Sequence, residues 1–172
     1  GIGPELAAIA RGVQAAGWRV PLLGSWTLSM RNFIEAAGIA GNGALMPQTF
    51  IQDAGSTAKN SFLLAYKRAF KTDLIPSPMS AAQGYDGMHL LAHAIRQARS
   101  LDGDAIRRAL ENLDFRYQGV VTSYESPFSA EDHNAITTNM IVMGKVGNGR
   151  VDYAYREDQQ RSALLRMKRG SN

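Results

Sequence analysis

The order of the expected helices and strands is the feature that most restricts the fold. Apolar periodicity and glycine stops predict a helix from Pro4 to about Gly17, a strand over 18–23, a helix over 29–37 and a strand over 43–46. Such alternation is typical of an α/β fold in which helical crossovers join parallel strands. We therefore expect Rossmann-like packing in this part of the chain.

The alternation then stops, because three helices follow with no strand between them. We expect them over 56–70, from Pro78 to about Arg99, and after a cap at Asp102 or Asp104. The side chains expected to face the core are Phe62, Leu63, Tyr66, Phe70, Tyr85, Met88, Leu91, Ala92, Ile95, Ile106, Leu110 and Leu113. Those expected to face solvent are Lys59, Lys67 and Lys71.

The end of the chain is rich in β signals. Residues 119–124 are expected to pair at a sheet edge, and 136–146 read as a strand. Gly-Asn-Gly at 147–149 predicts a hairpin turn, followed by a return strand in which Val151, Tyr153 and Tyr155 alternate. Residues 157–172 form a basic tail that we expect to be solvated.

Composition limits the classes of function. The 172 residues are 45% hydrophobic, enough for a core in one domain or two small lobes. The chain has no cysteine, which excludes disulfides, thiolate catalysis and cysteine metal sites. The net charge is +4, but the cations are scattered and no aromatic residues interleave with the basic tail, so we do not expect nucleic-acid binding.

Three features resemble enzyme motifs. His89 and His93 have the spacing of metal ligands on a helix, but HExxH and a third ligand are missing, so we expect no metal. Residues 129–134 contain Ser, Asp and His, but adjacent loop residues seldom form a triad. Gly147 and Gly149 belong to the hairpin turn and form no phosphate-binding loop. We expect no catalysis.

Five strings, in this order, carry a resemblance to a known family. They are GPELAAIARGVQAAGW, VPLLGSWTLS, SPMSAAQGYDGMHLLAHAI, DGDAIRRALENLDF and SPFSAEDHNA, followed by the terminal hairpin. Together they resemble the C-terminal half of type I periplasmic binding proteins, and most of all the branched-chain amino-acid (Leu/Ile/Val) solute-binding subunits of ABC transporters. The family's N-terminal half has no counterpart here, and Gly1 opens on a loop that would follow a strand, so we expect a longer parent protein.

The resemblance implies an α/β fold of two lobes with parallel sheets, of which only part is present. It implies that residues 1–50 belong to lobe 2, 51–132 to lobe 1 and 133–156 to lobe 2 again. It implies a periplasmic solute-binding subunit that takes a small amino-acid-like or aromatic carboxylate ligand into the cleft between lobes and delivers it to ABC permease subunits, without a cofactor. A ligand-sensing regulator with the same fold, and a homodimer of the fragment, stay open.

The expected ligand-binding residues lie on three segments. The long helix opens with small and polar residues, and free N–H groups at a helix start suit a polar ligand. The resemblance places Met79, Ser80 and Gln83 at the cleft there; the alternative is a plain helix start with Ser77 as N-cap. It also places Ile2 and Gly3 at the cleft, where small size implies a roomier pocket or only a turn that needs glycine.

The third segment is the loop of Ser25, Trp26 and Thr27. In amino-acid-binding members a carboxylate in this loop pairs with the ligand ammonium, whereas no Asp or Glu lies between Gly24 and Asn32 here. An unpaired ammonium in a closed cleft is costly. We therefore expect a flat ligand such as an aromatic carboxylate against Trp26, the alternative being that Trp26 packs between lobes.

Two segments are expected to cross between the lobes and absorb hinge motion. The first consists of Gln48, Thr49 and Phe50, and the second is 129–134, with Asp132 and His133 as its hinge residues.

Overall fold

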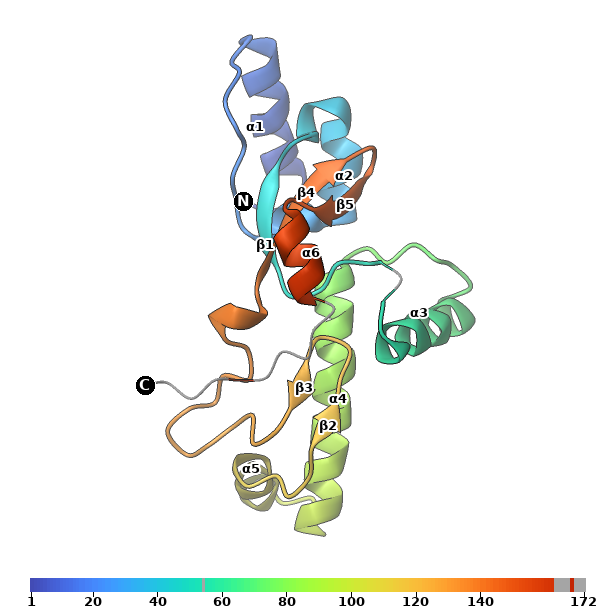
Figure 1. Ribbon diagram of the computed structural model, residues 1–172, viewed down its shortest axis with the longest axis vertical. Coiled ribbons are helices and arrows are strands. Elements are labelled where there is room, and N and C mark those ends of the chain that lie inside the picture. Colours follow the sequence, from blue (N-terminus) through green and yellow to red (C-terminus); the bar gives the residue numbers. More distant parts are fainter. Residues whose placement is uncertain (54, 163–167, 169–172) are drawn as a thin grey trace.

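The computed structural model describes residues 1–53, 55–162 and 168. In it the chain forms two bodies, one above the other in Figure 1. We call them the upper body, which holds α1, α2, β1, β4, β5 and α6, and the lower body, which holds α3, α4, α5, β2 and β3. Most of the expected basic tail lies outside the described residues.

The upper body is a small sheet packed against three helices. Its helices are α1 (Pro4–Ala15), α2 (Arg31–Ala37) and α6 (Arg156–Ser162), with 3₁₀ turns η1 (Trp26–Ser29) and η2 (Gly38–Gly41). Its strands are β1 (Leu45–Gln48), β4 (Val142–Gly147) and β5 (Arg150–Tyr153), in the order β1-β4-β5. The core gathers side chains from α1, α2 and the sheet, among them Ala7, Phe33, Met46 and Val146.

The lower body is helical. It contains α3 (Thr57–Phe70), α4 (Pro78–Ala98) and α5 (Gly103–Glu111), and a small hairpin of β2 (Tyr117–Gln118) and β3 (Ser123–Tyr124). One core lies between α3 and α4 around Phe62 and Ala82, and another between α4 and α5 around Leu90 and Ala109. Asp102 caps α5 by accepting a hydrogen bond from the backbone of Ala105 (2.9 Å).

The expected strand over 18–23 is not formed. Residues 22–24 meet β1 at one isolated parallel bridge, where Gly24 N donates to Leu45 O (3.1 Å) and Leu45 N donates to Leu22 O (2.8 Å). Pro21 cannot donate to a ladder, which limits the pairing to this point. The named strands of the described chain pair antiparallel, so the expected parallel pairing survives only in the bridge.

The C-terminal β region is shorter than expected. Residues 138–140 form the 3₁₀ turn η3 (Thr138–Met140), and β4 begins only at Val142. The Thr137 hydroxyl bonds the Asn139 side chain, a local contact that competes with a strand ladder. The hairpin turn is confirmed: Asn148 and Gly149 both have positive φ (51° and 78°), as a two-residue type I′ turn requires. Of residues 119–124, only Ser123 and Tyr124 form a strand, β3, which pairs with β2 in a separate two-stranded hairpin.

On two helices, individual side chains differ from the expected orientation. On α3, Lys59 is buried and Phe70 is exposed, the reverse of the prediction. On α4, Met88 is exposed, and the buried residues are Met79, Ala82, Asp86, Leu90 and Ala94. These buried residues follow a spacing of three and four, as in a helix. One of them is the carboxylate Asp86, and a search for apolar periodicity does not detect a charged residue.

Candidate functional site

The chain crosses from the upper to the lower body directly after β1. Gln48, Thr49 and Phe50 are all buried there. The Gln48 amide donates to Pro47 O (2.9 Å) and, at 3.5 Å, to Trp26 O. The Thr49 hydroxyl accepts a hydrogen bond from the Gln83 amide (2.9 Å). This crossing therefore connects a predicted ligand-binding residue from each body.

The loop of the upper body is held in shape by its own hydroxyl groups. Ser25 Oγ lies 2.6 Å from Thr27 Oγ1, and Ser29 Oγ donates to Trp26 O (2.7 Å). Thr27 and Ser29 are buried, whereas Trp26 keeps 37% of its surface exposed. The indole is thus the large side chain that this loop leaves accessible.

The start of α4 is less open than expected. Met79 is buried, and the Gln83 amide is occupied by Thr49. Ser77 stands at the N-cap but accepts no bond from the helix; its hydroxyl donates to Ser80 Oγ (2.8 Å). The N–H groups of the first turn are therefore not capped by a side chain.

Gly3 has a local structural reason. It precedes α1 with φ of +55°, and a Cβ built there would lie 2.4 Å from the Asn32 amide nitrogen. The turn and the close approach of α2 both require glycine. Ile2, beside it, is exposed.

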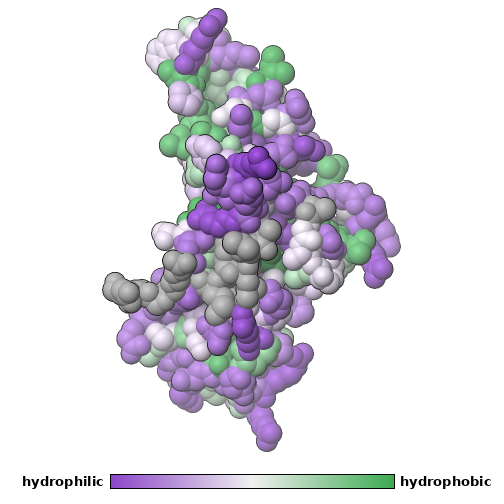
Figure 2. Space-filling model, in the orientation of Figure 1, coloured by the Kyte–Doolittle hydropathy of each residue, from purple (hydrophilic) through white to green (hydrophobic). Residues whose placement is uncertain are grey.

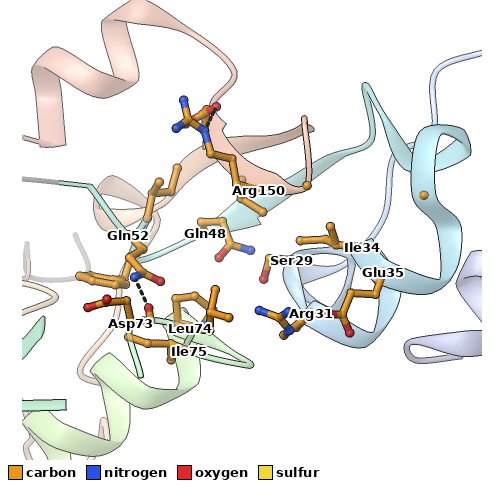
Figure 3. A pocket seen from close by; sticks show the side chains of 17 residues that line it. Ser29, Arg31, Ile34, Glu35, Gln48, Gln52, Asp73, Leu74, Ile75 and Arg150 are labelled. Atoms are coloured by element: carbon orange, nitrogen blue, oxygen red, sulfur yellow. Dashed lines mark hydrogen bonds and ion pairs between the residues drawn. The ribbon is translucent and has the colours of Figure 1, made fainter. Parts of the chain in front are cut away.

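A cavity of about 460 Å³ opens between the two bodies beside the crossing (Figure 3). Two nearly buried polar side chains, Ser29 and Gln48, reach it from the upper body. The lower body contributes an apolar wall that includes Leu74 and Ile75. The backbone N–H of Arg31 donates to Pro76 O (2.9 Å), so the two bodies also touch at its edge.

Charged residues at the cavity are paired. Arg31 pairs with Glu35, Arg150 with Asp152 (2.9 Å) and Lys67 with Asp73 (2.9 Å). Of the predicted ligand-binding and hinge residues, only Gln48 and Phe50 line the cavity among the residues described. The sequence did not predict the other residues that line the cavity, because they come from segments far apart in the chain.

Asp132 and His133 do not lie at the crossing. His133 Nε2 lies 3.1 Å from Glu111 Oε1, at the end of α5, which Figure 1 shows at the lower end of the molecule. Asp132 pairs with Lys168 (2.7 Å), and this hydrogen bond, followed by one from the Asn134 backbone, lowers the pKa of Asp132. Ile136 still packs in the lower body, so the return to the upper body follows it, before β4.

The enzyme-like features have packing roles. His89 stacks on Tyr117 (ring centroids 5.4 Å apart) and His93 on Phe115 (3.8 Å). The Ser129 hydroxyl accepts from the backbone of Asp132 (3.1 Å), as in a tight turn. Within the described ranges, no three His, Asp or Glu side chains gather as metal ligands would. None of the described helices has both the length and the apolar character for crossing a bilayer.

Comparison with known proteins agrees with this architecture. Residues 1–150 match the family described as periplasmic binding protein. A type 1 periplasmic binding protein from Bordetella pertussis Tohama I is 29% identical, with a TM-score of 0.73, over 89% of this chain and 44% of that one. The leucine-binding protein LivK from Thermotoga maritima is 25% identical, with a TM-score of 0.70, over 90% of this chain and 42% of that one.

A more distant structure shares the fold alone. It is an ABC transporter solute-binding protein from R. palustris in complex with benzoate, 20% identical, with a TM-score of 0.67, over 86% of this chain and 39% of that one. No curated protein sequence matches this chain. The chain spans less than half the length of each of these three structures. Since the family match covers most of the sequence, the chain belongs to the periplasmic binding protein family, as an α/β portion of the type I fold.

Proposed function

We propose that this chain is part of the solute-binding subunit of an ABC importer and takes a small molecule between its two bodies. The observation that carries the proposal is the crossing itself: Gln48 donates to the Trp26 carbonyl of the upper body, Thr49 accepts from Gln83 of the lower body, and a cavity lined by both bodies opens beside them. Pockets that combine apolar walls with a few placed polar groups are typical small-molecule sites. A periplasmic location and a membrane permease as partner belong to the same proposal.

Uptake would couple to lobe closure. A ligand that touches both bodies binds better when they are close together, so it shifts the population toward that arrangement. In this proposal the upper body acts as one lobe and the lower body as the other; the boundary expected at residue 133 moves to a point after Ile136, which still packs in the lower body. Gln48 ends β1 of the upper body, and Thr49 and Phe50 follow it toward α3 of the lower body.

We propose an aromatic carboxylate as the ligand class, with Trp26 as its apolar wall. The loop from Gly24 to Asn32 lacks a carboxylate that could neutralise an ammonium, and the Trp26 indole is accessible. The benzoate-bound protein from R. palustris indicates that the fold accommodates such a ligand. Ser25, Thr27, Ser80 and Gln83 are the polar candidates, and Ile2, Gly3 and Met79 complete the proposed set.

Tryptophan fluorescence tests this directly, because the chain has only two tryptophans. In a Trp18→Phe variant, Trp26 is the sole indole. Benzoate should quench it in a saturable way, whereas leucine should not. Replacing Trp26 by Ala should weaken benzoate binding about threefold to tenfold in calorimetry, the loss of one aromatic contact.

The outcomes separate the possibilities. Quenching by leucine instead would keep the solute-binding role and overturn the aromatic ligand class. Native mass spectrometry of the purified chain would identify a co-purified ligand independently. Because the chain spans less than half of its relatives, we expect its own affinity to be weaker than submicromolar. A submicromolar dissociation constant would contradict that expectation.

A further inference from the structure

Lys59 is the one buried lysine of the described chain, at 7% exposure. It lies on α3 of the lower body, in a helix whose other basic side chains, such as Lys67 and Arg68, face solvent. A lysine ammonium is seldom buried without partners, because removing it from water is costly. Its partners should therefore show what it does.

Those partners come from two different parts of the molecule, the crossing segment and β5. The ammonium lies 2.7 Å from Asp53 Oδ1, directly after the crossing, and 5.4 Å from the centre of the Phe50 ring. It also lies 3.4 Å from the hydroxyl of Tyr153, on β5 of the upper body. The same hydroxyl accepts a hydrogen bond from Ser162 Oγ on α6 (2.8 Å).

We infer that Lys59 is a positioning residue that fixes the orientation of the two bodies through Tyr153. The inference rests on the proposed function only in assuming that the bodies move relative to each other. Asp53 lies on the lower-body side and neutralises the charge of Lys59, and the Phe50 ring lies beside the ammonium. The contact with Tyr153 is the part that depends on orientation, since Tyr153 belongs to the upper body.

The geometry suits a reversible contact. At 3.4 Å the bond to Tyr153 is long, and a hydrogen bond of this kind contributes modestly to stability. When the bodies separate, the ammonium keeps its ion pair with Asp53, so no charge is left buried and unpaired. Loss of the Tyr153 contact should therefore change the distribution of orientations without unfolding either body.

The absence of cysteine makes the orientation measurable. Cysteines introduced at Gln14 on α1 and Arg108 on α5, both exposed, can carry spin labels for distance measurement by double electron–electron resonance. We expect Tyr153→Phe and Lys59→Met to increase a second distance population about twofold to fivefold, as the loss of one weak hydrogen bond implies.

Three controls define the result. Lys67→Met removes an exposed lysine of the same helix whose partner, Asp73, also belongs to the lower body, and should change nothing. Ser162→Ala removes the other contact of the Tyr153 hydroxyl and should leave the distances unchanged. Lys59→Arg should restore the wild-type distribution.

Identical distributions in Tyr153→Phe and wild type would overturn the inference, and so would an equal effect of Ser162→Ala. Tyr153→Phe removes one oxygen atom, so it keeps the test valid if Lys59→Met fails to fold. Because no ligand is needed, a negative result leaves the proposed ligand site standing. Conversely, a failure of benzoate to bind leaves the role of Lys59 standing.

Discussion

At the scale of single residues, Asp86 shows how a buried carboxylate can organise a turn. It has 1% exposure and lies in the middle of α4. Its oxygens accept hydrogen bonds from Val120 N (2.8 Å), Val121 N (2.8 Å) and Tyr124 OH (3.0 Å). The carboxylate therefore ties the β2–β3 hairpin to the long helix, with partners that a neutral side chain cannot fully replace.

Replacing Asp86 by Asn should destabilise the protein by about 2–3 kcal/mol at neutral pH. The amide can accept only at one atom, so buried N–H and O–H donors lose their acceptor. Urea denaturation followed by circular dichroism measures this. An Asp114→Asn variant, at a solvent-exposed position, should cost much less, and equal losses would contradict the explanation.

The pH dependence of stability in wild type and in Asp86→Asn gives a second test. Burial raises the pKa of Asp86 above its usual range, although hydrogen bonds from Val120, Val121 and Tyr124 act in the opposite direction. A raised folded-state pKa means that, as pH falls, the folded protein takes up a proton at a higher pH than the unfolded chain does. The contribution of this titration to stability is therefore greatest below the unfolded pKa and is lost as pH rises through the folded pKa.

The difference in unfolding free energy between wild type and Asp86→Asn should accordingly grow as pH falls from neutral toward 4. Parallel denaturation series on the two proteins measure it and cancel the titration of all other groups. A difference that shrinks on acidification would mean that the hydrogen bonds outweigh the burial.

At the scale of helices and strands, α4 and the hairpin it holds offer a matched pair of glycines. A Cβ at Gly87 on α4 meets nothing within 4 Å, whereas one at Gly119 would lie 2.6 Å from Asp86 Oδ2 and 2.6 Å from the Tyr124 ring. Gly87→Ala should stabilise by about 0.5–1 kcal/mol, since alanine is the better helix former.

Gly119→Ala should instead destabilise by about 1–3 kcal/mol, because the buried neighbours have to move. Thermal unfolding of both variants and of wild type measures these two changes in stability. A neutral result at Gly119 would show that the hairpin shifts freely away from α4.

How far the sequence predicts this fold depends on the range of the forces involved. Helices whose caps and glycines are local signals, such as α1 and α5, were predicted within a few residues. The predicted inward positions of Phe62, Leu63 and Tyr66 on α3 are confirmed. The outward position of Lys59 was wrong, because only tertiary contact with Asp53 and Tyr153 makes its burial favourable. The strand over 18–23 was wrong for a similar reason, since strand pairing depends on a partner that local pattern does not contain.

The residues of the candidate site likewise fall into those that the sequence predicted and those that only the tertiary structure brings together. The segment Gln48–Phe50 was predicted as a crossing from the family resemblance, and the structure brings it beside the cavity. Arg31, Leu74 and Arg150 were missed, because nothing in their local sequence indicates that three distant segments meet there. Whether Trp26 and its neighbours bind the ligand stays a prediction.

At the scale of the whole molecule, the upper body leaves an apolar edge open to solvent. Trp18, Val20 and Leu23 are each more than half exposed along the segment beside α1, and Figure 2 shows apolar surface at that edge. Unpaired extended segments with large apolar side chains favour association with another chain. We therefore propose that the purified chain self-associates through this edge.

A double variant, Val20→Lys with Leu23→Lys, should shift the chain toward monomer in sedimentation velocity runs at several concentrations. Charges on an open edge oppose pairing. Leu101→Lys is the control, because Leu101 is even more exposed but lies in the lower body between α4 and α5. If only the control variant dissociates, the contact lies elsewhere.

The sheet of the upper body also sets an order for folding during synthesis. β1 pairs with β4, which the ribosome makes only after the whole of α3, α4 and α5. The contacts within the lower body are closer in sequence and pay a smaller loop-closure cost. The lower body should therefore form first on a growing chain. The sheet of the upper body stays incomplete until residue 153 has left the ribosome. During that interval β1 is an unpaired strand, so this is when the nascent chain most needs a chaperone.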